Sequence, residues 1–399
     1  MAIERRTVAA MSTASAVSVA NIYYCQPLLS EIGRSLGVSD HAIGYLPMWT
    51  QAGTALGMLA FVPLGDMLPR RGLIVLMCAL SAATVAAMAL APNLLLVDAA
   101  GFGVGLTTIV AHLILPFAAK LAPPDRRGHV VGTVLSGLLL GILLARVVSG
   151  FVGALLGWRA MFWIAAGSMS ALALALRFAL PYDRPEPGLR YRELIRSIGN
   201  LVLTQPVLRE AALVGGMLFG AFSSFWATLV FLLATPPYHF GARVAGIFGL
   251  VGAVGVLAAP LAGRLTDRKG PELTVTLAIL TAIASYAVFY AAGYSIAGLI
   301  AGVILLDLGV QAGHVANQTR IYALIPEARS RLNTVYMVTY FLGGAVGSAL
   351  GAYGWSKRGW AGVCVAGAMQ LVVALAVRGW MSATRRTVPV AGRAETSPV

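Results

Sequence analysis

Charged residues are scarce in this chain. Asp, Glu, Lys and Arg together make up 11% of the 399 residues, whereas 58% are hydrophobic. In soluble domains the charged residues make up roughly a quarter of the chain. The composition therefore excludes an ordinary soluble protein and predicts a protein embedded in a lipid bilayer.

Motifs of catalysis and cofactor binding are also absent. The sequence has no Walker A motif, no HExxH and no GxSxG. Its three cysteines, Cys25, Cys78 and Cys364, lie in separate apolar runs without CxxC spacing. We therefore expect no enzyme activity, no cofactor and no metal site. The net charge of +14 does not indicate nucleic acid, because the basic residues lie between apolar runs rather than along one stripe.

Apolar runs long enough to span a bilayer, roughly 20 residues each, occur twelve times. The runs are Val8–Ser30, Ala42–Leu64, Gly72–Ala91, Leu94–Ala119, Val130–Leu156, Ala160–Leu180, Ala211–Thr235, Val244–Gly263, Leu273–Ala292, Ile296–Ile321, Thr334–Tyr353 and Ala361–Trp380. Glycines recur at helical spacing in the second, fifth, eighth and eleventh runs, which favours close contact between helices there.

The two halves of the chain repeat one another. The segment 63–72 has an Asp followed by two basic residues, and 263–270 has the same pattern about half a chain later. Other pairs share nearly this separation: His112 and His314, Gly141 and Gly343, Trp158 and Trp360. A fixed period of this kind indicates a duplicated unit. We expect 263–270 to be a short loop between membrane helices, like its counterpart.

The predicted fold is an all-α membrane protein with twelve transmembrane helices in two pseudo-symmetric six-helix bundles. Residues 1–181 form the first bundle, 182–206 a cytoplasmic linker with an amphipathic helix, and 207–399 the second bundle and a short tail. Most basic residues between runs fall on the side of the N-terminus. By the positive-inside rule both termini are cytoplasmic, and the expected location is the bacterial inner membrane.

The repeated segment resembles a signature of the major facilitator superfamily, G-x-L-x-D-R-x-G. The second copy matches it at Gly263, Leu265, Asp267, Arg268 and Gly270. The first copy keeps an Asp and two Arg but has Val62, Met67 and Pro69 at signature positions. The resemblance implies alternating access around a central cavity. It also implies a cytoplasmic gate, formed by Asp66, Arg70, Arg71, Asp267 and Arg268. The alternative is that these basic residues only set the topology.

The segment Asn-Ile-Tyr-Tyr-Cys-Gln-Pro-Leu-Leu, 21–29, further resembles a bacterial subgroup described as efflux permeases. The fifth run departs from the glycine-proline pattern of the drug antiporters, since Ile142 follows Gly141, and Ala99 stands where they carry an arginine. The substrate and the coupling ion therefore stay open.

Polar side chains within the tenth run are the strongest candidates for a site. Asp307, Gln311, His314 and Gln318 are spaced by four, three and four, which places them on one helix face. We expect this face to line a watery cavity, because an ionised group in hydrocarbon costs at least ~2.5 kcal/mol. Low polarity favours a neutral carboxyl, so Asp307 is a candidate proton carrier. The alternative is a structural ion pair.

Other candidates lie in the first, fourth, fifth and seventh runs. Arg146 is at a depth similar to that of Asp307 and is the expected partner, in a permanent pair or in one that substrate or a proton breaks. His112 is equivalent to His314 and serves either in packing or in proton coupling. Asn21, Tyr24, Gln26 and Trp226 either bind a moderately apolar substrate or pack the helices.

These observations predict a secondary active transporter that acts as a monomer and moves a small organic compound, with proton-coupled export favoured. An uptake symporter or a uniporter is the alternative. A receptor, a scramblase or a membrane enzyme is a more remote one.

Overall fold

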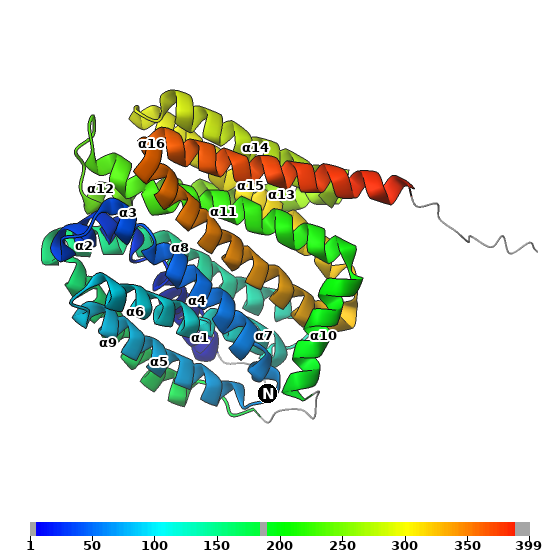
Figure 1. Cartoon of the computed structure of the whole chain (residues 1–399). Helices are drawn as coiled ribbons and strands as arrows, with labels where there is room; N and C mark the ends of the chain where they lie inside the picture. Colours follow the sequence, from blue (N-terminus) through cyan, green and yellow to red (C-terminus); the bar gives the residue numbers. More distant parts are fainter. Residues whose placement is uncertain (1–4, 184–189, 388–399) are drawn as a thin grey trace, which may run out of the picture.

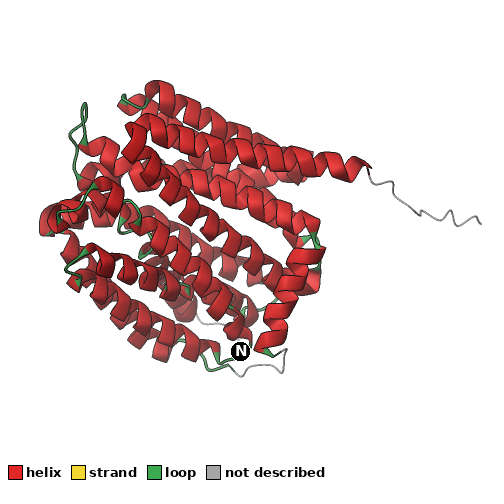
Figure 2. Cartoon of the chain, viewed as in Figure 1, coloured by secondary structure: helices red, strands yellow, loops and turns green. Residues whose placement is uncertain are grey.

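The computed structural model describes residues 5–183 and 190–387, without the side chains of 254–259 and 383–387. Regular structure within these ranges is entirely helical (Figure 2). In order, the elements are α1 (Arg5–Ala20), η1 (Gln26–Leu28), α2 (Leu29–Leu36), α3 (Asp40–Ile43), α4 (Leu46–Phe61), η2 (Pro63–Asp66), α5 (Arg70–Leu90), α6 (Leu94–Thr107), α7 (Val110–Leu121), α8 (Arg127–Leu156), α9 (Trp158–Ala179), α10 (Tyr191–Thr204), α11 (Pro206–Ala234), α12 (Ala242–Val251), α13 (Ala253–Lys269), α14 (Pro271–Ala292), α15 (Ile296–Tyr322), η3 (Pro326–Ala328) and α16 (Arg329–Thr387).

Twelve spans in two six-helix bundles account for these elements. Within the described ranges, eight helical stretches are long and apolar enough to cross a membrane. The last of them holds two spans, because α16 leaves the helical conformation at Arg358 and Gly359. Gly359 has a φ of +55°, which glycine adopts without strain. The other three spans are broken helices: α1 with η1 and α2, α3 with α4, and α12 with α13.

Several predicted boundaries were wrong. Four of the runs are interrupted: the first at 21–25, the second at Gly44 and Tyr45, the fourth at Thr108 and Ile109, and the eighth at Gly252. The expected loop 263–270 is instead helical as far as Lys269, and only Gly270, with a φ of +87°, ends α13. The reason is that charged residues end an apolar run without ending a helix. The predicted linker helix is α10, whereas 184–189 and the tail 388–399 lie outside the described residues.

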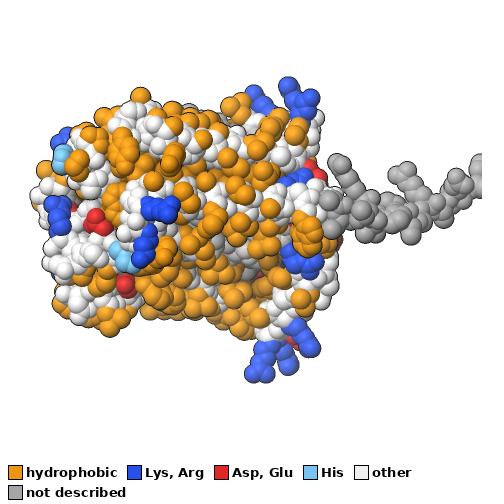
Figure 3. Space-filling view, turned by 45° about the horizontal axis from the view of Figure 1, so that its top comes forward, with side chains coloured by type: hydrophobic (Ala, Val, Ile, Leu, Met, Phe, Trp, Pro, Cys, Tyr) orange, Lys and Arg blue, Asp and Glu red, His pale blue; other side chains and the backbone are white. Residues whose placement is uncertain are grey.

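The start of the chain, α10 and the end of α16 lie at one end of the molecule (Figure 1). We call this the terminal end and the opposite one the far end. On the face shown in Figure 3, hydrophobic side chains cover the middle while Lys and Arg gather toward the two ends. This banded surface suits a bilayer, whose hydrocarbon core contacts apolar side chains.

Glycines allow the helices within each bundle to cross closely, as their spacing predicts. A Cβ at Gly343 of α16 would overlap the carbonyl of Gly216 on α11. In the first bundle, a Cβ at Gly53 of α4 would overlap the carbonyl of Phe102 on α6. The two bundles contact each other where α4 packs on α16 and where α8 packs on α12.

A buried cluster of charges holds the second bundle together at the terminal end. The Glu210 carboxylate of α11 lies 2.8 Å from a guanidinium nitrogen of Arg320 on α15 and 2.8 Å from one of Arg378 on α16. Arg378 also lies 2.9 Å from Glu272 of α14. The Glu210 side chain has no solvent exposure. The cluster therefore ties α11, α15 and α16 through charges removed from water, and α14 through the exposed carboxylate of Glu272.

We expect the substitution Glu210→Gln to lower the free energy of unfolding by roughly 3–5 kcal/mol, because it leaves two buried arginines short of a counter-charge. Glu272→Gln is the matched control, since it removes a partner of the same Arg378 from a carboxylate that is 55% exposed. Its expected cost is about 1 kcal/mol or less. Reversible unfolding of both variants in mixed micelles measures the difference. Equal losses would contradict the role assigned to burial.

Candidate functional site

The first span breaks next to a buried arginine. α1 ends at Ala20, and 21–25 form turns before η1. Pro27 in η1 has no N–H to donate to the preceding turn. The break directs Tyr23 and Gln26 toward Arg146 of α8, whose guanidinium Nε donates a hydrogen bond of 2.8 Å to Gln26 Oε1.

Aromatic rings surround the Arg146 side chain, which is 3% exposed. The guanidinium carbon lies 4.1 Å from the ring centroid of Trp226, 4.8 Å from that of Tyr23 and 5.7 Å from that of Phe222. Trp226 and Phe222 are on α11 of the second bundle. Cations are attracted to the faces of aromatic rings at these distances. Arg146 is thus held at the contact between the two bundles.

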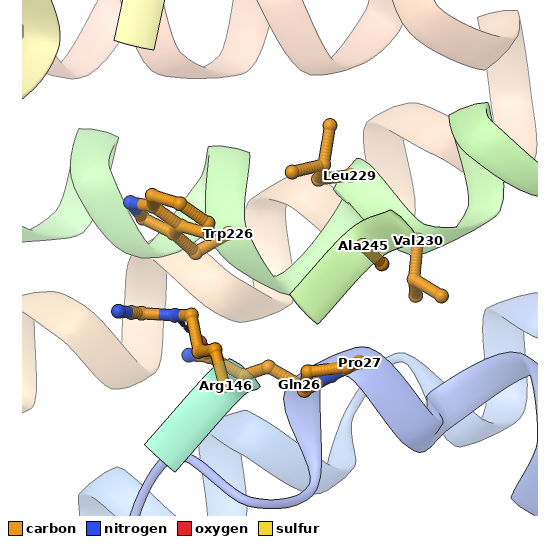
Figure 4. A pocket seen from close by; sticks show the side chains of 7 residues that line it. All are labelled: Gln26, Pro27, Arg146, Trp226, Leu229, Val230 and Ala245. Atoms are coloured by element: carbon orange, nitrogen blue, oxygen red, sulfur yellow. Dashed lines mark hydrogen bonds between the residues drawn. The ribbon is translucent and has the colours of Figure 1, made fainter. Parts of the chain in front are cut away.

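A small pocket lies at this contact, seen from close by in Figure 4. Side chains of both bundles line it, namely Gln26, Pro27, Arg146, Trp226, Leu229, Val230 and Ala245. Two of the predicted polar residues, Gln26 and Arg146, therefore meet at one place, together with Trp226.

Asp307 of α15 is close to this group but does not pair with Arg146. Among the described residues, no oxygen of Asp307 lies within the 4.0 Å of Arg146 that defines an ion pair, and Asp307 Oδ2 is buried without a hydrogen-bond partner. A methyl group on Gly252 would lie 3.2 Å from Asp307 Oδ1 and 3.5 Å from Trp226 Cζ2. Trp226 therefore neighbours both charged groups. Arg146 and Asp307 are therefore unpaired here, and a pair that substrate or a proton forms or breaks stays a prediction.

His314 and Gln318 of the α15 stripe contact α16 rather than lipid. His314 Nδ1 is 3.2 Å from the hydroxyl of Tyr336, and its ring centroid is 5.0 Å from that of Tyr340. Gln318 donates a hydrogen bond of 3.4 Å to Asn333. Gln311 is half-buried on the same helix. Two of the four polar residues of this stripe, His314 and Gln318, therefore have partners on α16.

The remaining candidates are dispersed. His112 of α7 packs its ring edge-on against Phe341 of the second bundle, with centroids 6.2 Å apart, and its Nδ1 is buried without a partner. Asn21 is buried with both amide atoms unpartnered, and Tyr24 is half-buried. Neither Asn21 nor Tyr24 lines the pocket beside Arg146.

A polar contact between the bundles was missed from sequence. Gln51 of α4 donates a hydrogen bond of 2.9 Å to Ser348 of α16 and accepts one of 3.2 Å from Ser223 of α11. All three side chains are buried. The signal in the sequence was the single amide of Gln51 within the second apolar run. It was missed because the hydropathy averaged over the run is still that of an apolar segment.

The residues of the predicted gate are not joined across the bundles. Asp66 pairs with Arg70 at 3.0 Å, one turn along the chain. Arg71, Asp267 and Arg268 form no ion pair within 4.0 Å to any residue that the structure describes, and Asp267 is exposed. The ion pairs between described residues join partners within one bundle.

The sequence and the fold both match known transporters. A model described as Major Facilitator Superfamily matches residues 11–348. The uncharacterized transporter YgaY of Escherichia coli O157:H7 is 43% identical over 367 residues, covering 92% of this chain and 93% of YgaY. A chloramphenicol efflux pump of Mycobacterium tuberculosis is 26% identical over 268 residues, covering 64% of this chain and 63% of the pump. A bacterial homolog of the human lysosomal transporter Spinster, in an inward-facing and unoccupied conformation, superimposes with a TM-score of 0.71 at 16% identity, covering 95% of this chain and 96% of the homolog.

Proposed function

The chain belongs to the Major Facilitator Superfamily, and from this premise we propose that it is a secondary active transporter that exports a small organic compound in exchange for protons. The observation that carries the proposal is the buried arginine of one bundle beside the buried carboxyl of the other, each with an unpartnered polar atom. Similarity to an efflux pump supports export as the direction.

Alternating access is proposed to occur by rocking of the bundles about this midplane site, as in other transporters built from parallel repeats. The contacts between the bundles that support this rocking lie between the middle of the molecule and the far end. They include the hydrogen bonds of Gln51 and the approach of Gly44 to Ala352, where an added Cβ would lie 2.9 Å from the Cβ of Ala352. Opening of the far end requires these contacts to break. The gate residues Asp66, Arg70, Arg71, Asp267 and Arg268 would then meet at the terminal end.

Asp307 is proposed to carry the proton. Its side chain is 7% exposed and one carboxyl oxygen has no hydrogen-bond partner. An ionised carboxylate at this depth is costly, and binding of a proton removes that cost. A side chain that gains or loses charge at the interface between the bundles changes how strongly they attract each other. Protonation of Asp307 is therefore coupled to rocking, with His112 and His314 as further polar groups along the interface.

The orientation follows from charge. Basic residues concentrate in the connections at the terminal end, which favours a cytoplasmic location for both termini and for the linker 182–206. The bundles 1–181 and 207–399 are each proposed to move as a unit within a functional monomer of the bacterial inner membrane.

We expect Asp307→Asn to reduce accumulation driven by a pH gradient at least about tenfold, because the amide binds no proton, while exchange without a gradient persists. Proteoliposomes loaded with a compound found by growth screening of overexpressing and deletion strains measure both. Asp98→Asn is the matched control, since it changes another carboxyl, on α6 of the first bundle. Full gradient-driven transport by Asp307→Asn would eliminate the proton-carrier role.

A disulfide across the far end tests alternating access directly. We expect Gly44→Cys with Ala352→Cys, in a protein without native cysteines, to stop transport on oxidation and to recover with dithiothreitol. The two Cβ positions are 2.9 Å apart, so a small shift of the helices brings them to the roughly 3.5–4.5 Å that a disulfide needs.

The matched control is Gly33→Cys with Ile43→Cys. Its Cβ positions are 3.7 Å apart, at the same end but within one bundle, so oxidation should leave transport unchanged. Unimpaired transport by the protein locked across Gly44 and Ala352 would contradict the rocking movement.

A further inference from the structure

The guanidinium of Arg146 has an unused donor edge. Its Nε is satisfied by Gln26 Oε1, but its Nη2 is buried and has no hydrogen-bond partner. No described carboxylate lies within 4.0 Å of the group. A buried cation without a counter-charge is costly, and a guanidinium binds a carboxylate through two parallel hydrogen bonds. The free edge is therefore suited to an anion.

A second unsatisfied donor lies next to this edge. The indole Nε1 of Trp226 is buried and has no partner. In Figure 4 the Trp226 indole nitrogen and the end of the Arg146 guanidinium lie on the same side of the pocket, away from Val230 and Pro27. An indole nitrogen only donates hydrogen bonds. Both free groups thus require an acceptor, which a cationic or purely apolar ligand does not supply.

A row of buried aromatic rings continues from this point along α11 and α16. Phe222 is next to Trp226, with ring centroids 5.9 Å apart, and stacks on Phe219 at 5.6 Å. Phe219 in turn stacks on Tyr340 at 4.1 Å. Aromatic rings pack favourably in such offset arrangements. A ligand with an aromatic body has rings to stack on beside the charged anchor.

We propose that the compound transported is an aromatic monocarboxylate, with Arg146 pairing with its carboxylate, Trp226 donating the further hydrogen bond, and the Phe222 side of α11 packing against its ring. This inference rests on the proposed function, because it names the substrate class of the same site. Gln26 is a positioning residue, since its amide holds the guanidinium through Nε while Nη2 keeps no partner.

The test is equilibrium binding to the purified full-length protein in detergent, measured by calorimetry. The probes are benzoate, salicylate and 4-aminobenzoate, each compared with its neutral amide, together with benzylamine as a cation. We expect each carboxylate to bind at least about tenfold more tightly than its amide, as a charge-assisted bidentate contact implies, and benzylamine not to bind. This comparison uses the native protein and needs no variant to fold.

Variants then assign the contact. Arg146→Gln should remove the preference for carboxylates, and Arg146→Lys should keep part of it, because lysine retains the charge without the planar fork. Arg177→Gln, a change of an exposed arginine on α9, should leave the preference unchanged. Equal binding of acid and amide, preference for the amine, a preference that survives Arg146→Gln, or no binding of any carboxylate would each overturn the inference.

Failure of this inference is separable from failure of the proposed function. Gradient-driven export of a neutral compound would support the proposed transport function and contradict the assignment of an anionic substrate. Selective binding of aryl carboxylates without gradient-driven movement would support the binding site and contradict proton-driven export.

Discussion

The cost of an uncompensated charge inside hydrocarbon organises this molecule. Where the charges serve only the fold, as around Glu210, each of them lies 2.8–2.9 Å from an opposite charge. Glu210 sits between two arginines, and four helices meet around that cluster. At the contact between the bundles, neither Arg146 nor Asp307 forms an ion pair within 4.0 Å with a residue that the structure describes. That contrast separates the polar groups that stabilise one bundle from those that are free to bind a ligand or a proton.

The packing of the helices bears on how the bundles can move. Inside each bundle, helices cross through glycines such as Gly105 and Gly343, so that backbone packs on backbone with little freedom. Between the bundles, α8 and α12 also cross through glycines, since a Cβ at Gly150 would overlap the carbonyl of Ala242 and one at Gly246 that of Arg146. The hydrogen bonds of Gln51 and the aromatic packing around Arg146 add to the contact. Movement of the bundles by rocking requires such contacts to slide or break. The contacts near the far end hold the present arrangement.

Much of the architecture was predictable from the sequence, because it depends on the apolar composition of the spans and on the internal repeat of about half the chain. Hydropathy located the twelve spans, and the internal repeat of the sequence indicated two similar six-helix bundles. Helix ends were less predictable, since α13 continues through its charged segment to Lys269 and the first span breaks after Ala20. Hydropathy reports where a segment leaves the hydrocarbon. It does not report where backbone hydrogen bonding stops, which depends on residues such as Pro27 and Gly270.

By itself, the sequence determined that the chain is a duplicated membrane protein and that Arg146 and Asp307 are costly residues within its spans. Only the tertiary structure decided their partners. Arg146 bonds to Gln26 and packs on Trp226 instead of pairing with Asp307. The physical reason is that depth in a membrane follows from position along a helix, whereas contact also depends on the rotation and tilt of each helix. Those are set by packing between segments far apart in the chain.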